Sequence, residues 1–496
     1  MPREIELKLG LSAAAVTAVR NHPLLRGDAP PQRLLSTYYD TPDLALWRHG
    51  IALRVRQLDG ERVQTVKSAG TRGGGLTDRP EWERPWRGAF DFSGIDEQRA
   101  ARVLRTHAAR LEPAFVTDFT REIRLFCEPG VAVRAMLDIG AVQVGSTSEP
   151  FCELELELGA GSPGDLYRLA LRLAETLPLW PEERSKAERG YRLCAGAEGA
   201  VPALVLSAAQ PAVAGFRDLV AAAVSDWQAG VRLVDGDAKE GVHQVRVALR
   251  RLRSLLRLFA PLLPDGFSNL WRARLGDLAR ELSTARELDV LCDELLVSAE
   301  YGEATWLTAL RQGLERERAD ARDAARELLA LPRQGRVMLE LLAAVYAVTN
   351  VVVPGSPGLG EFAGARMARL RRRFRRRLHK LPAAASEPWH ALRIAAKQLR
   401  YGLDFFAPLW PRKAASGFRR RLARIQADLG GIQDLDVAVQ RLRERSVTDP
   451  QCLADALRLA AHHAEEVAAW RRNALRQSWK LLAERPSWKR PLKTDR

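Results

Sequence analysis

The chain has 496 residues, of which 46% are hydrophobic and 28% are charged, and its formal net charge is +16 at pH 7. This length exceeds what a single hydrophobic core organises and this apolar content excludes a disordered chain, so we expect two or more globular domains. The five cysteines are scattered without a C-x-x-C pair, which argues against a disulfide framework, a zinc knuckle and a redox motif.

The sequence offers no segment for export or for a membrane. The first ten residues alternate charged and apolar side chains without an apolar core, so we expect no signal peptide. The longest uncharged run, between Glu340 and Glu361, is interrupted by Pro354 and Pro357, which leaves its apolar part well below the roughly 20 residues of a membrane span. We therefore expect a cytoplasmic protein without a membrane span.

The first part of the chain, to about residue 158, contains eight short segments in which polar and apolar residues alternate with the period of a β-strand. They lie at 3–9, 33–39, 51–58, 61–68, 80–86, 119–126, 131–138 and 151–158. Helical patterns near 12–20, 96–108 and 163–177 accompany them. The polar residues of these strands are mostly charged and of both signs.

Charged residues share one face of each predicted strand. Glu4, Glu6 and Lys8 alternate with apolar residues, which places them on one face about 6–7 Å apart. The same pattern recurs in later strands at Arg54 and Arg56, at Lys67, at Glu81 and Glu83, and at Glu153, Glu155 and Glu157. One such strand is typical of a sheet with a solvated face. Several together favour a closed eight-stranded barrel whose interior binds a divalent cation through carboxylates and a polyphosphate through Arg and Lys.

A group of motifs in this region is similar to one known family. The motifs are E-x-E-x-K at 4–8, YYDTPDLALWRHGIALRVR at 38–56, TVK at 65–67, EWE at 81–83, LDIG at 137–140, CELELEL at 152–158 and SKAERGY at 185–191. In this order they resemble the CYTH domain, the family of triphosphate tunnel metalloenzymes, over residues 1–195. The resemblance implies an eight-stranded antiparallel tunnel that holds a triphosphate and one or two Mg²⁺ or Mn²⁺ ions.

The resemblance also implies roles for individual residues. Metal ligands would be Glu4, Glu6 and Glu155, with Glu153, Asp138 and Glu83 as second choices. Phosphate oxygens would be bound by Lys8, Arg54, Arg56, Lys67, Arg121 and Lys186. Catalysis would depend on Glu4, Glu6, Lys8 and Lys186. Arg124 lies on the opposite face of the same predicted strand as Arg121, and a shift of one residue would exchange the two.

The charge excess lies entirely beyond the tunnel region. Residues 1–200 contain 27 Lys and Arg against 28 Asp and Glu, and residues 201–496 contain 50 against 33, a net +17. This asymmetry predicts a second domain that faces a polyanion, although an Arg-rich solvated surface would give the same count. Residues 195–215 are small, nearly uncharged and rich in Gly and Pro, so we place a linker at 196–212.

From about residue 213 onward the pattern is helical and it repeats itself. HQVRVALRRLR at 243–253 aligns with HALRIAAKQLR at 390–400, an offset of 147 residues. The same offset aligns WRARL at 271–275 with FRRRL at 418–422, and ELSTARELDVL at 281–291 with DLGGIQDLDVA at 428–438. One offset that serves three blocks indicates an internal duplication.

Each copy of the first block presents a basic stripe on one helix face. Its members, at positions 0, 3, 7 and 10, span an arc of about 80°. They are His243, Arg246, Arg250 and Arg253 in the first copy and His390, Arg393, Lys397 and Arg400 in the second. A solvated basic face is the simpler interpretation of one such stripe, but two stripes with a leading histidine favour a binding surface.

These blocks resemble the CHAD domain, the conserved-histidine α-helical domain, over roughly residues 213–480, and we assign 213–490 to it. The resemblance implies two pseudo-symmetric four-helix bundles whose stripes bind inorganic polyphosphate, with polyphosphate granules as a further expected location. A third basic segment, MARLRRRFRRRLHKL at 367–381, is predicted as a helix. Nucleic acid would also attract such a surface, but no base-reading module is evident and aromatic residues are only 7% of the chain, which leaves few stacking platforms.

The sequence therefore predicts an α+β multidomain protein: an eight-stranded antiparallel barrel followed by an all-α domain. We expect a metal-dependent inorganic triphosphatase with a polyphosphate-binding domain. Hydrolysis of nucleoside triphosphates and cyclisation of ATP in the same tunnel remain alternatives, as does a non-catalytic polyphosphate-binding scaffold. The oligomeric state does not follow from the sequence.

Overall fold

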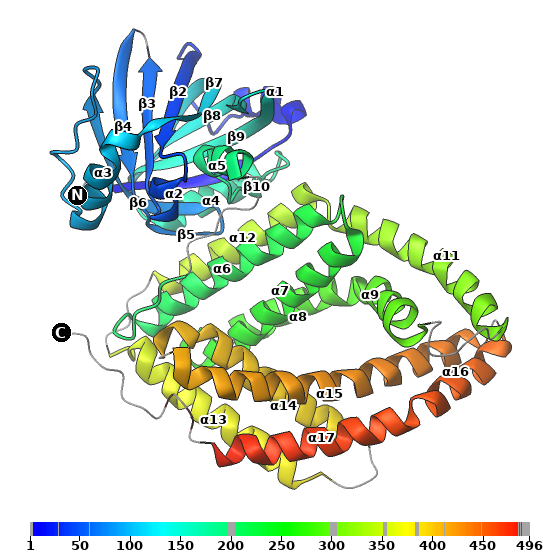
Figure 1. Ribbon diagram of the computed structural model, residues 1–496. Coiled ribbons are helices and arrows are strands. Elements are labelled where there is room, and N and C mark those ends of the chain that lie inside the picture. The colour runs from blue at the N-terminus through cyan, green and yellow to red at the C-terminus, as the bar shows by residue number, and fades with distance from the viewer. Residues whose placement is uncertain are drawn as a thin grey trace. The chain divides into compact units, whose positions relative to one another are not determined.

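The computed structural model describes residues 3–27, 29–58, 60–195, 204–297, 305–350, 355–381, 386–410, 412–447, 449–484, 486 and 488. The chain divides into two compact units, which are treated separately below (Figure 1). One unit comprises Met1–Ala203 with Ala330–Val351, and the other comprises Leu204–Leu329 with Val352–Arg496. Of the predicted linker 196–212, residues 196–203 lie outside the described residues.

The first unit is built on antiparallel strands. They are β1 (Arg3–Gly10), β2 (Gln32–Asp40), β3 (Ala52–Leu58), β4 (Glu61–Lys67), β5 (Thr71–Gly73), β6 (Leu76–Pro85), β7 (Glu112–Glu128), β8 (Val131–Val144), β9 (Thr147–Ala160) and β10 (Trp180–Pro181). Eight of them follow the order β1-β9-β8-β7-β2-β3-β4-β6, and β6 pairs again with β1. The predicted eight-stranded antiparallel barrel is therefore confirmed. The short strands β5 and β10 pair in addition with β6 and β1.

The strands β7, β8 and β9 are longer than predicted. Two-residue turns join them, with Gly130 and Gly145 at positive φ angles of 77° and 54°. Tight turns of this kind require a residue that tolerates positive φ, which glycine does without strain. They keep the three strands in register along most of their length, beyond the segments where the alternation of polar and apolar residues is regular.

The barrel has a polar interior and an apolar exterior covered by helices. On β1, Leu7 and Leu9 are fully buried on the outer face, against which α4 (Pro163–Leu173) packs. On the β3–β4–β6 side, α3 (Gln98–His107) and α2 (Ala45–Arg48) cover a second apolar cluster. The unit also contains η1 (Ala13–Ala15), α1 (Val16–Arg20), η2 (Ala108–Arg110) and α5 (Lys186–Ala195). Because the helices bury the apolar side chains on the outside of the barrel, the inward-facing positions can carry charged residues.

One helix of the first unit comes from the middle of the predicted helical domain. Helix α12 (Leu331–Thr349) packs on α4 and β10. Its Leu342 lies so close to Gly74 that a Cβ atom there would be 2.7 Å from the Leu342 side chain, and Gly74 has a positive φ of 64°. Tyr346 packs on Tyr167, with ring centroids 4.8 Å apart. The compact unit around the barrel therefore includes α12 as part of its apolar cover.

Removing one side chain of α12 should destabilise the barrel unit. Because Leu342 is fully buried, we expect Leu342→Ala to cost about 2–5 kcal/mol of unfolding free energy. That loss corresponds to a fall of roughly 5–15 °C in the melting transition of this unit. Calorimetry of the full chain measures it, with Arg333→Ala on the exposed side of α12 as the control. An unchanged transition would contradict the packing of α12 as part of this unit.

The second unit is helical. Its elements are α6 (Ala212–Leu233), α7 (Ala238–Phe259), η3 (Ala260–Leu262), α8 (Phe267–Glu281), α9 (Ser283–Val290), the π-helical η4 (Leu291–Leu295), α11 (Thr305–Leu328), α13 (Leu359–His379), α14 (Ser386–Phe405), η5 (Ala407–Leu409), α15 (Arg412–Arg445), α16 (Gln451–His462) and α17 (Ala464–Ala483). No helix among the described residues combines the length and the apolar content that a membrane span requires.

The internal duplication is visible as a local twofold arrangement. The offset of 147 residues carries α6 onto α13, α7 onto α14, and α8 with α9 onto α15. The backbone N–H of Ala212 donates to Pro357 O (3.1 Å) and that of Leu359 donates to Gln210 O (2.8 Å), a reciprocal pair related by the same offset. The equivalent residues Phe259 and Phe406 also meet, with ring centroids 5.9 Å apart. The two copies thus face each other across a pseudo-twofold axis.

Candidate functional site

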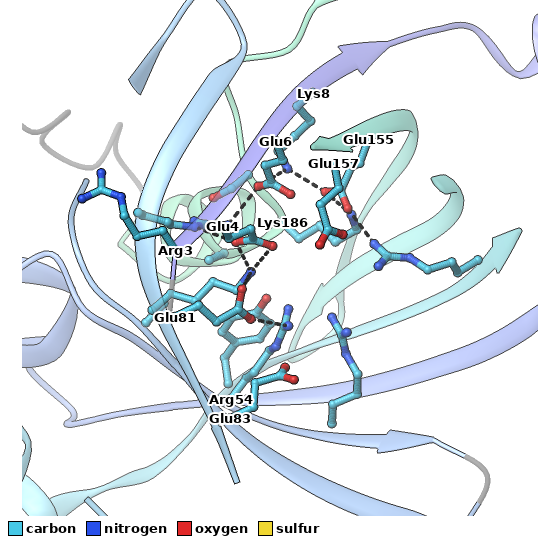
Figure 2. A pocket seen from close by; sticks show the side chains of 18 of the residues that line it. Arg3, Glu4, Glu6, Lys8, Arg54, Glu81, Glu83, Glu155, Glu157 and Lys186 are labelled. Atoms are coloured by element: carbon cyan, nitrogen blue, oxygen red, sulfur yellow. Dashed lines mark hydrogen bonds and ion pairs between the residues drawn. The ribbon is translucent and has the colours of Figure 1, made fainter. Parts of the chain in front are cut away.

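A cavity of about 440 Å³ lies in the barrel, and charged side chains point into it from several strands (Figure 2). Among the described residues, nine cations and six carboxylates line it. The cations are Arg3, Lys8, Arg54, Arg56, Lys67, Arg79, Arg121, Arg134 and Lys186, and the carboxylates are Glu4, Glu6, Glu81, Glu83, Glu155 and Glu157. The lining therefore has a net positive charge, which suits an anion, and it also contains carboxylates that could bind a cation together with that anion.

The strand register explains why these side chains meet. Across β8, β9 and β1, Arg134 lies opposite Glu157, which lies opposite Glu6. One row further, Glu155 lies opposite Lys8. Side chains directly opposite each other in an antiparallel pair are about 5 Å apart, so the register places Glu157 beside Arg134, Lys8 beside Glu155, and the two carboxylates Glu6 and Glu157 beside each other.

On the β1–β4–β6 side, two cations each bridge neighbouring carboxylates. Lys67 Nζ lies 2.7 Å from Glu4 and 3.1 Å from Glu81. Arg79 lies 3.2 Å from Glu4 and 3.0 Å from Glu6. Burial opposes ionisation of Glu4, but Lys67 and Arg79 outweigh it and hold the pKa of Glu4 well below its usual value. Burial raises the pKa of Glu81, and the adjacent Glu4 carboxylate adds to this rise.

On the β7–β8–β9 side, the charges are more deeply buried. Lys8 Nζ lies 2.6 Å from Glu155 and 3.1 Å from Glu6. Arg121 lies 2.6 Å from both Glu155 and the fully buried Asp138. Burial disfavours the Lys8 ammonium, but Glu155 and Glu6 outweigh it and raise the pKa of Lys8. These cations therefore stay charged over the whole physiological pH range.

Lys186, the first residue of α5, fills the centre of a carboxylate cluster. Its Nζ lies 2.7 Å from Asp138 and 3.1 Å from Glu155, and it also pairs with Glu153. Its other neighbours are the rings of Phe119 and Phe151, whose centroids are 4.9 and 5.1 Å from Nζ. The ammonium thus occupies the point toward which three carboxylates converge.

The opposite wall is an excess-cation region formed by β3. Arg54 lies 3.6 Å from Glu81, and Arg56 pairs with no carboxylate among the described residues but donates to Ser36 Oγ at 3.3 Å. Burial, with Arg54 and Arg121 nearby, lowers the pKa of Arg56 to about 10. An anion that enters the cavity would relieve this repulsion, so this wall is suited to phosphate oxygens.

The carboxylates fit a divalent cation of the hard, oxygen-binding type. Ligand atoms of Asp138, Glu153 and Glu155 lie within 4.8 Å of one another. The Oε2 atom of Glu153 is buried without a hydrogen-bond partner among the described residues. Glu4 and Glu6 also line the cavity, and Arg79 donates a hydrogen bond to each of them. Because Lys186 occupies the centre of the Asp138–Glu153–Glu155 cluster, the carboxylates that could take Mg²⁺ or Mn²⁺ from the cavity are Glu4, Glu6 and Glu155.

Most residues proposed from the sequence lie together. Lys8, Arg54, Arg56, Lys67, Arg121 and Lys186 all line the cavity, as do Glu4, Glu6, Glu83 and Glu155. Asp138 and Glu153 are fully buried behind the lining, and Glu83 lies at the exposed end, where it accepts a hydrogen bond from Thr65. Arg121 faces inward, whereas Arg124 donates to the carbonyl of Gly27 outside the barrel.

Besides Arg3 at the start of β1, the cavity lining includes four residues that were not assigned from the sequence: Arg79, Arg134, Glu81 and Glu157. Arg79 and Glu81 share a strand face with Glu83, and Glu157 shares one with Glu155. The same parity within each strand is the signal that would have included them. Arg79 is the most consequential of the four, because it contacts both Glu4 and Glu6.

In the helical unit, residues of the two basic stripes approach each other. Arg250 of α7 interacts electrostatically with Arg393 and Lys397 of α14. Burial, together with these arginines, lowers the pKa of Lys397 to about 7, and burial with Arg250 nearby lowers that of Arg246 to about 10. The stripes therefore form a region of net positive charge, which Asp434 and Glu287 offset only in part.

The remaining stripe residues lie in different surroundings. Arg253 neighbours Arg272 and Arg280 of α8, and Arg400 lies 3.7 Å from Asp404. His390 is hydrogen-bonded to Gln433 (2.5 Å). His243 is half-buried beside Arg286, which is the equivalent of Gln433 at the offset of 147, and burial lowers the pKa of His243. Sequence reasoning did not assign Arg286 or Asp434, which interacts with Arg393 and Lys397.

Comparison with known proteins identifies matches in both parts of the chain. Residues 2–191 match the model of the CYTH domain, and residues 218–443 match that of the CHAD domain. An inorganic triphosphatase of Haemophilus influenzae is 30% identical over 214 residues, which are 39% of this chain and 55% of the relative. An uncharacterized protein of Mycobacterium tuberculosis is 26% identical over 282 residues, 53% of each chain. The chain thus spans about half the length of these curated relatives.

The helical unit also has a solved counterpart. The crystal structure of the CHAD domain from the plant Ricinus communis is 28% identical to this chain, with a TM-score of 0.51. The match covers 57% of this chain and 96% of the plant domain. The likeness extends over nearly the whole of that domain.

Proposed function

Because this chain carries a CYTH domain at residues 2–191 followed by a CHAD domain at residues 218–443, we propose that it is a metal-dependent inorganic triphosphatase that binds inorganic polyphosphate through its helical domain. The products are diphosphate and phosphate. The relationship to a curated inorganic triphosphatase supports the substrate class. The free thiols of all five cysteines fit a reducing cytoplasm.

One observation supports the enzymatic proposal most strongly. Within the described residues, the barrel interior gathers nine cations and six carboxylates in a single cavity of about 440 Å³. Burying so many charges is expensive unless each is paired or neutralised by a ligand. A triphosphate with its counter-ion supplies both signs of charge, so it can replace the internal ion pairs with contacts of its own.

In this proposal the cations orient the substrate. Arg54 and Arg56 bind phosphate oxygens at the wall that lacks sufficient carboxylates. Lys8, Arg121 and Lys186 bind oxygens at the opposite wall and stay protonated, because carboxylates raise the pKa of each despite burial. Fixed cations that are aimed at the developing charge of a transferred phosphoryl group lower the barrier by positioning and electrostatics, without a covalent nucleophile.

The carboxylates hold the cation in the same proposal. Glu4, Glu6 and Glu155 are the ligands we assign, with Glu153 and Asp138 available nearby. A bound Mg²⁺ or Mn²⁺ ion supplies charge neutralisation on the phosphate oxygens and activation of water. Lys67 and Arg79 lower the pKa of Glu4 and so favour the ionised form that a divalent cation requires, and Arg79 also donates to Glu6.

Phosphate release from three substrates tests the enzymatic proposal. Inorganic triphosphate, ATP and long-chain polyphosphate are each incubated with the purified full chain in Mg²⁺, Mn²⁺ or EDTA. We expect release chiefly from triphosphate, and none in EDTA. No release from any substrate by folded protein that still retains polyphosphate would identify the chain as a binding scaffold and contradict the proposal.

The helical domain should bind polyphosphate more weakly at high pH. Lys397 has a pKa of about 7 without ligand, lowered by burial and by Arg393 and Arg250, and a bound polyanion would raise it. Affinity is therefore full below pH 7 and falls above it, by at most about tenfold per pH unit. Arginine keeps its charge in this range, so Lys397→Arg should reduce the change to less than about twofold. Titrations with long-chain polyphosphate at pH 6–9 and constant salt measure both proteins, and parallel profiles would contradict this assignment.

A further inference from the structure

A second cavity, of about 480 Å³, lies in the helical unit between α7, α13 and α14, and we call it the α13 groove. Helix α13 and the residue that ends it contribute Arg366, Arg369, Arg373, Arg376, Arg377 and Lys380, and α7 contributes Arg257. No carboxylate lines the groove in the described part of the chain, and none of these seven cations forms an ion pair there. The groove is therefore a concentrated and unneutralised positive site.

The neighbouring cations act on one another. Burial lowers the pKa of Arg257, and Arg272 and Arg373 add to the effect. Burial lowers the pKa of Arg366 in the same way, with Arg369 beside it. An anion in the groove would remove this repulsion. Cavities of this volume typically take small molecules.

The groove also has an aromatic and aliphatic floor. Tyr401 and Phe405 of α14 line it with their rings near parallel, at 20° and with centroids 6.2 Å apart, and Leu258 and Leu370 complete the floor. Tyr401 is partly exposed and lines the groove, so a ligand can reach its ring. Beside it, the side-chain oxygen of Gln398 is buried without a hydrogen-bond partner among the described residues. A bare phosphate chain gains nothing from such a floor, whereas a planar ring stacks on it.

The cations that α13 contributes to the groove are specific to the second copy of the repeat. At the offset of 147, Arg366 corresponds to Leu219, Arg373 to Asp226 and Arg376 to Ala229. The basic stripes, in contrast, are present in both copies. The arginines of α13 are therefore no part of the duplicated stripe, although Arg257 of the groove lies near the stripe residue Arg253.

We propose that the α13 groove binds a nucleoside polyphosphate. The base stacks on Tyr401 with the Gln398 amide at its edge, and the phosphates contact the arginines of α13. A single-stranded nucleic acid would use the same groups, but it needs a series of aromatic platforms along a track, and the floor offers one adjoining ring pair. This site is independent of the tunnel and of its proposed activity.

Two double variants of the same helix test the phosphate half of the proposal. Arg369→Ala/Arg376→Ala removes two exposed cations that line the groove, and Arg372→Ala/Arg375→Ala removes two exposed cations that do not. Calorimetric titration of the full chain with ATP in EDTA compares them, so binding elsewhere contributes equally. We expect the first variant to weaken ATP binding by about tenfold or more and the second by less than about twofold. Equal losses would reduce the groove to a diffuse electrostatic effect and overturn the proposal.

A third variant tests the base. We expect Tyr401→Leu, which keeps an apolar side chain and removes the ring, to weaken ATP binding by about fivefold or more and to leave tripolyphosphate binding unchanged. Tyr401→Phe should keep the affinity for ATP and shows that the fold tolerates a change here. Equal effects of Tyr401→Leu on both ligands, or no effect on ATP, would overturn nucleotide recognition. Preference for an oligonucleotide over ATP would identify a nucleic-acid site instead and would also overturn the proposal.

Discussion

Substitution of Glu4 and Glu6 by glutamine should abolish metal-dependent hydrolysis of triphosphate. Both carboxylates face the barrel cavity, and glutamine keeps their size while removing the charge that a divalent cation needs. The ion contributes several kcal/mol of transition-state stabilisation, so the double variant should lose about a thousandfold or more in rate. Phosphate release with saturating Mg²⁺ or Mn²⁺ measures the loss.

The appropriate control removes two carboxylates from the same domain outside the cavity. Glu128 is exposed, Asp43 is partly exposed and neither lines the cavity, so Asp43→Asn/Glu128→Gln should hydrolyse triphosphate at the rate of the unmodified protein. The Glu4→Gln/Glu6→Gln protein should still retain long-chain polyphosphate, which shows that the helical domain is folded. If this variant hydrolyses triphosphate at an undiminished rate, the assignment of Glu4 and Glu6 is wrong.

The converse loss is expected when the basic stripes are removed. In the variant Arg246→Ala, Arg250→Ala, Arg393→Ala and Lys397→Ala, polyphosphate affinity should fall by about a hundredfold or more at physiological salt. The reason is that these four cations face one another with few acidic neighbours, so each contributes directly to the attraction of a linear polyanion. The dependence of affinity on salt should also become less steep. Triphosphate hydrolysis should be unaffected.

A matched variant separates this surface from net charge alone. Four exposed arginines outside the stripes, Arg420, Arg424, Arg443 and Arg472, are replaced by alanine in the control. This control variant loses the same number of positive charges as the stripe variant and should keep most of its affinity for polyphosphate. Retention of polyphosphate by the stripe variant, or equal losses in the two variants, would show that the stripes are not the binding surface.

The barrel was predictable because its strands carry an unusual regularity. Alternation of charged and apolar residues fixes both the strand and the face that each residue occupies, and the eight predicted strands form the closed barrel. The role of α12 was not predictable. Its apolar face, with Leu342 and Tyr346, indicates that the helix packs on something but not on which partner. That choice depends on Gly74 and Tyr167, which are far away in the sequence.

The site was predictable to the extent that it follows strand faces. Glu4, Glu6 and Lys8 form a pattern within one strand. Arg79 and Arg134 also share a strand face with carboxylates, but strand register decides that they lie opposite Glu4 and Glu157. Register also decided between Arg121 and Arg124, because Arg121 lies opposite Asp138. Pairing across strands is a tertiary property, which local periodicity does not contain.

In the helical unit, the offset of 147 residues predicted which residues are equivalent but not which ones meet. The approach of Arg250 to Arg393 and Lys397 depends on how α7 and α14 cross. The groove under α13 illustrates the same limit. Its run of arginines was evident in the sequence, but the aromatic floor comes from Tyr401 and Phe405 of another helix.

Phosphorus NMR of triphosphate incubated with the full chain and Mg²⁺ tests the central claim most directly, because it identifies products as well as turnover. The proposed activity predicts that the triphosphate signals are replaced by equal amounts of diphosphate and phosphate, and that EDTA prevents this change. Unchanged triphosphate signals, or faster conversion of ATP to a cyclic nucleotide and diphosphate in a parallel sample, would contradict the assignment of the tunnel as an inorganic triphosphatase.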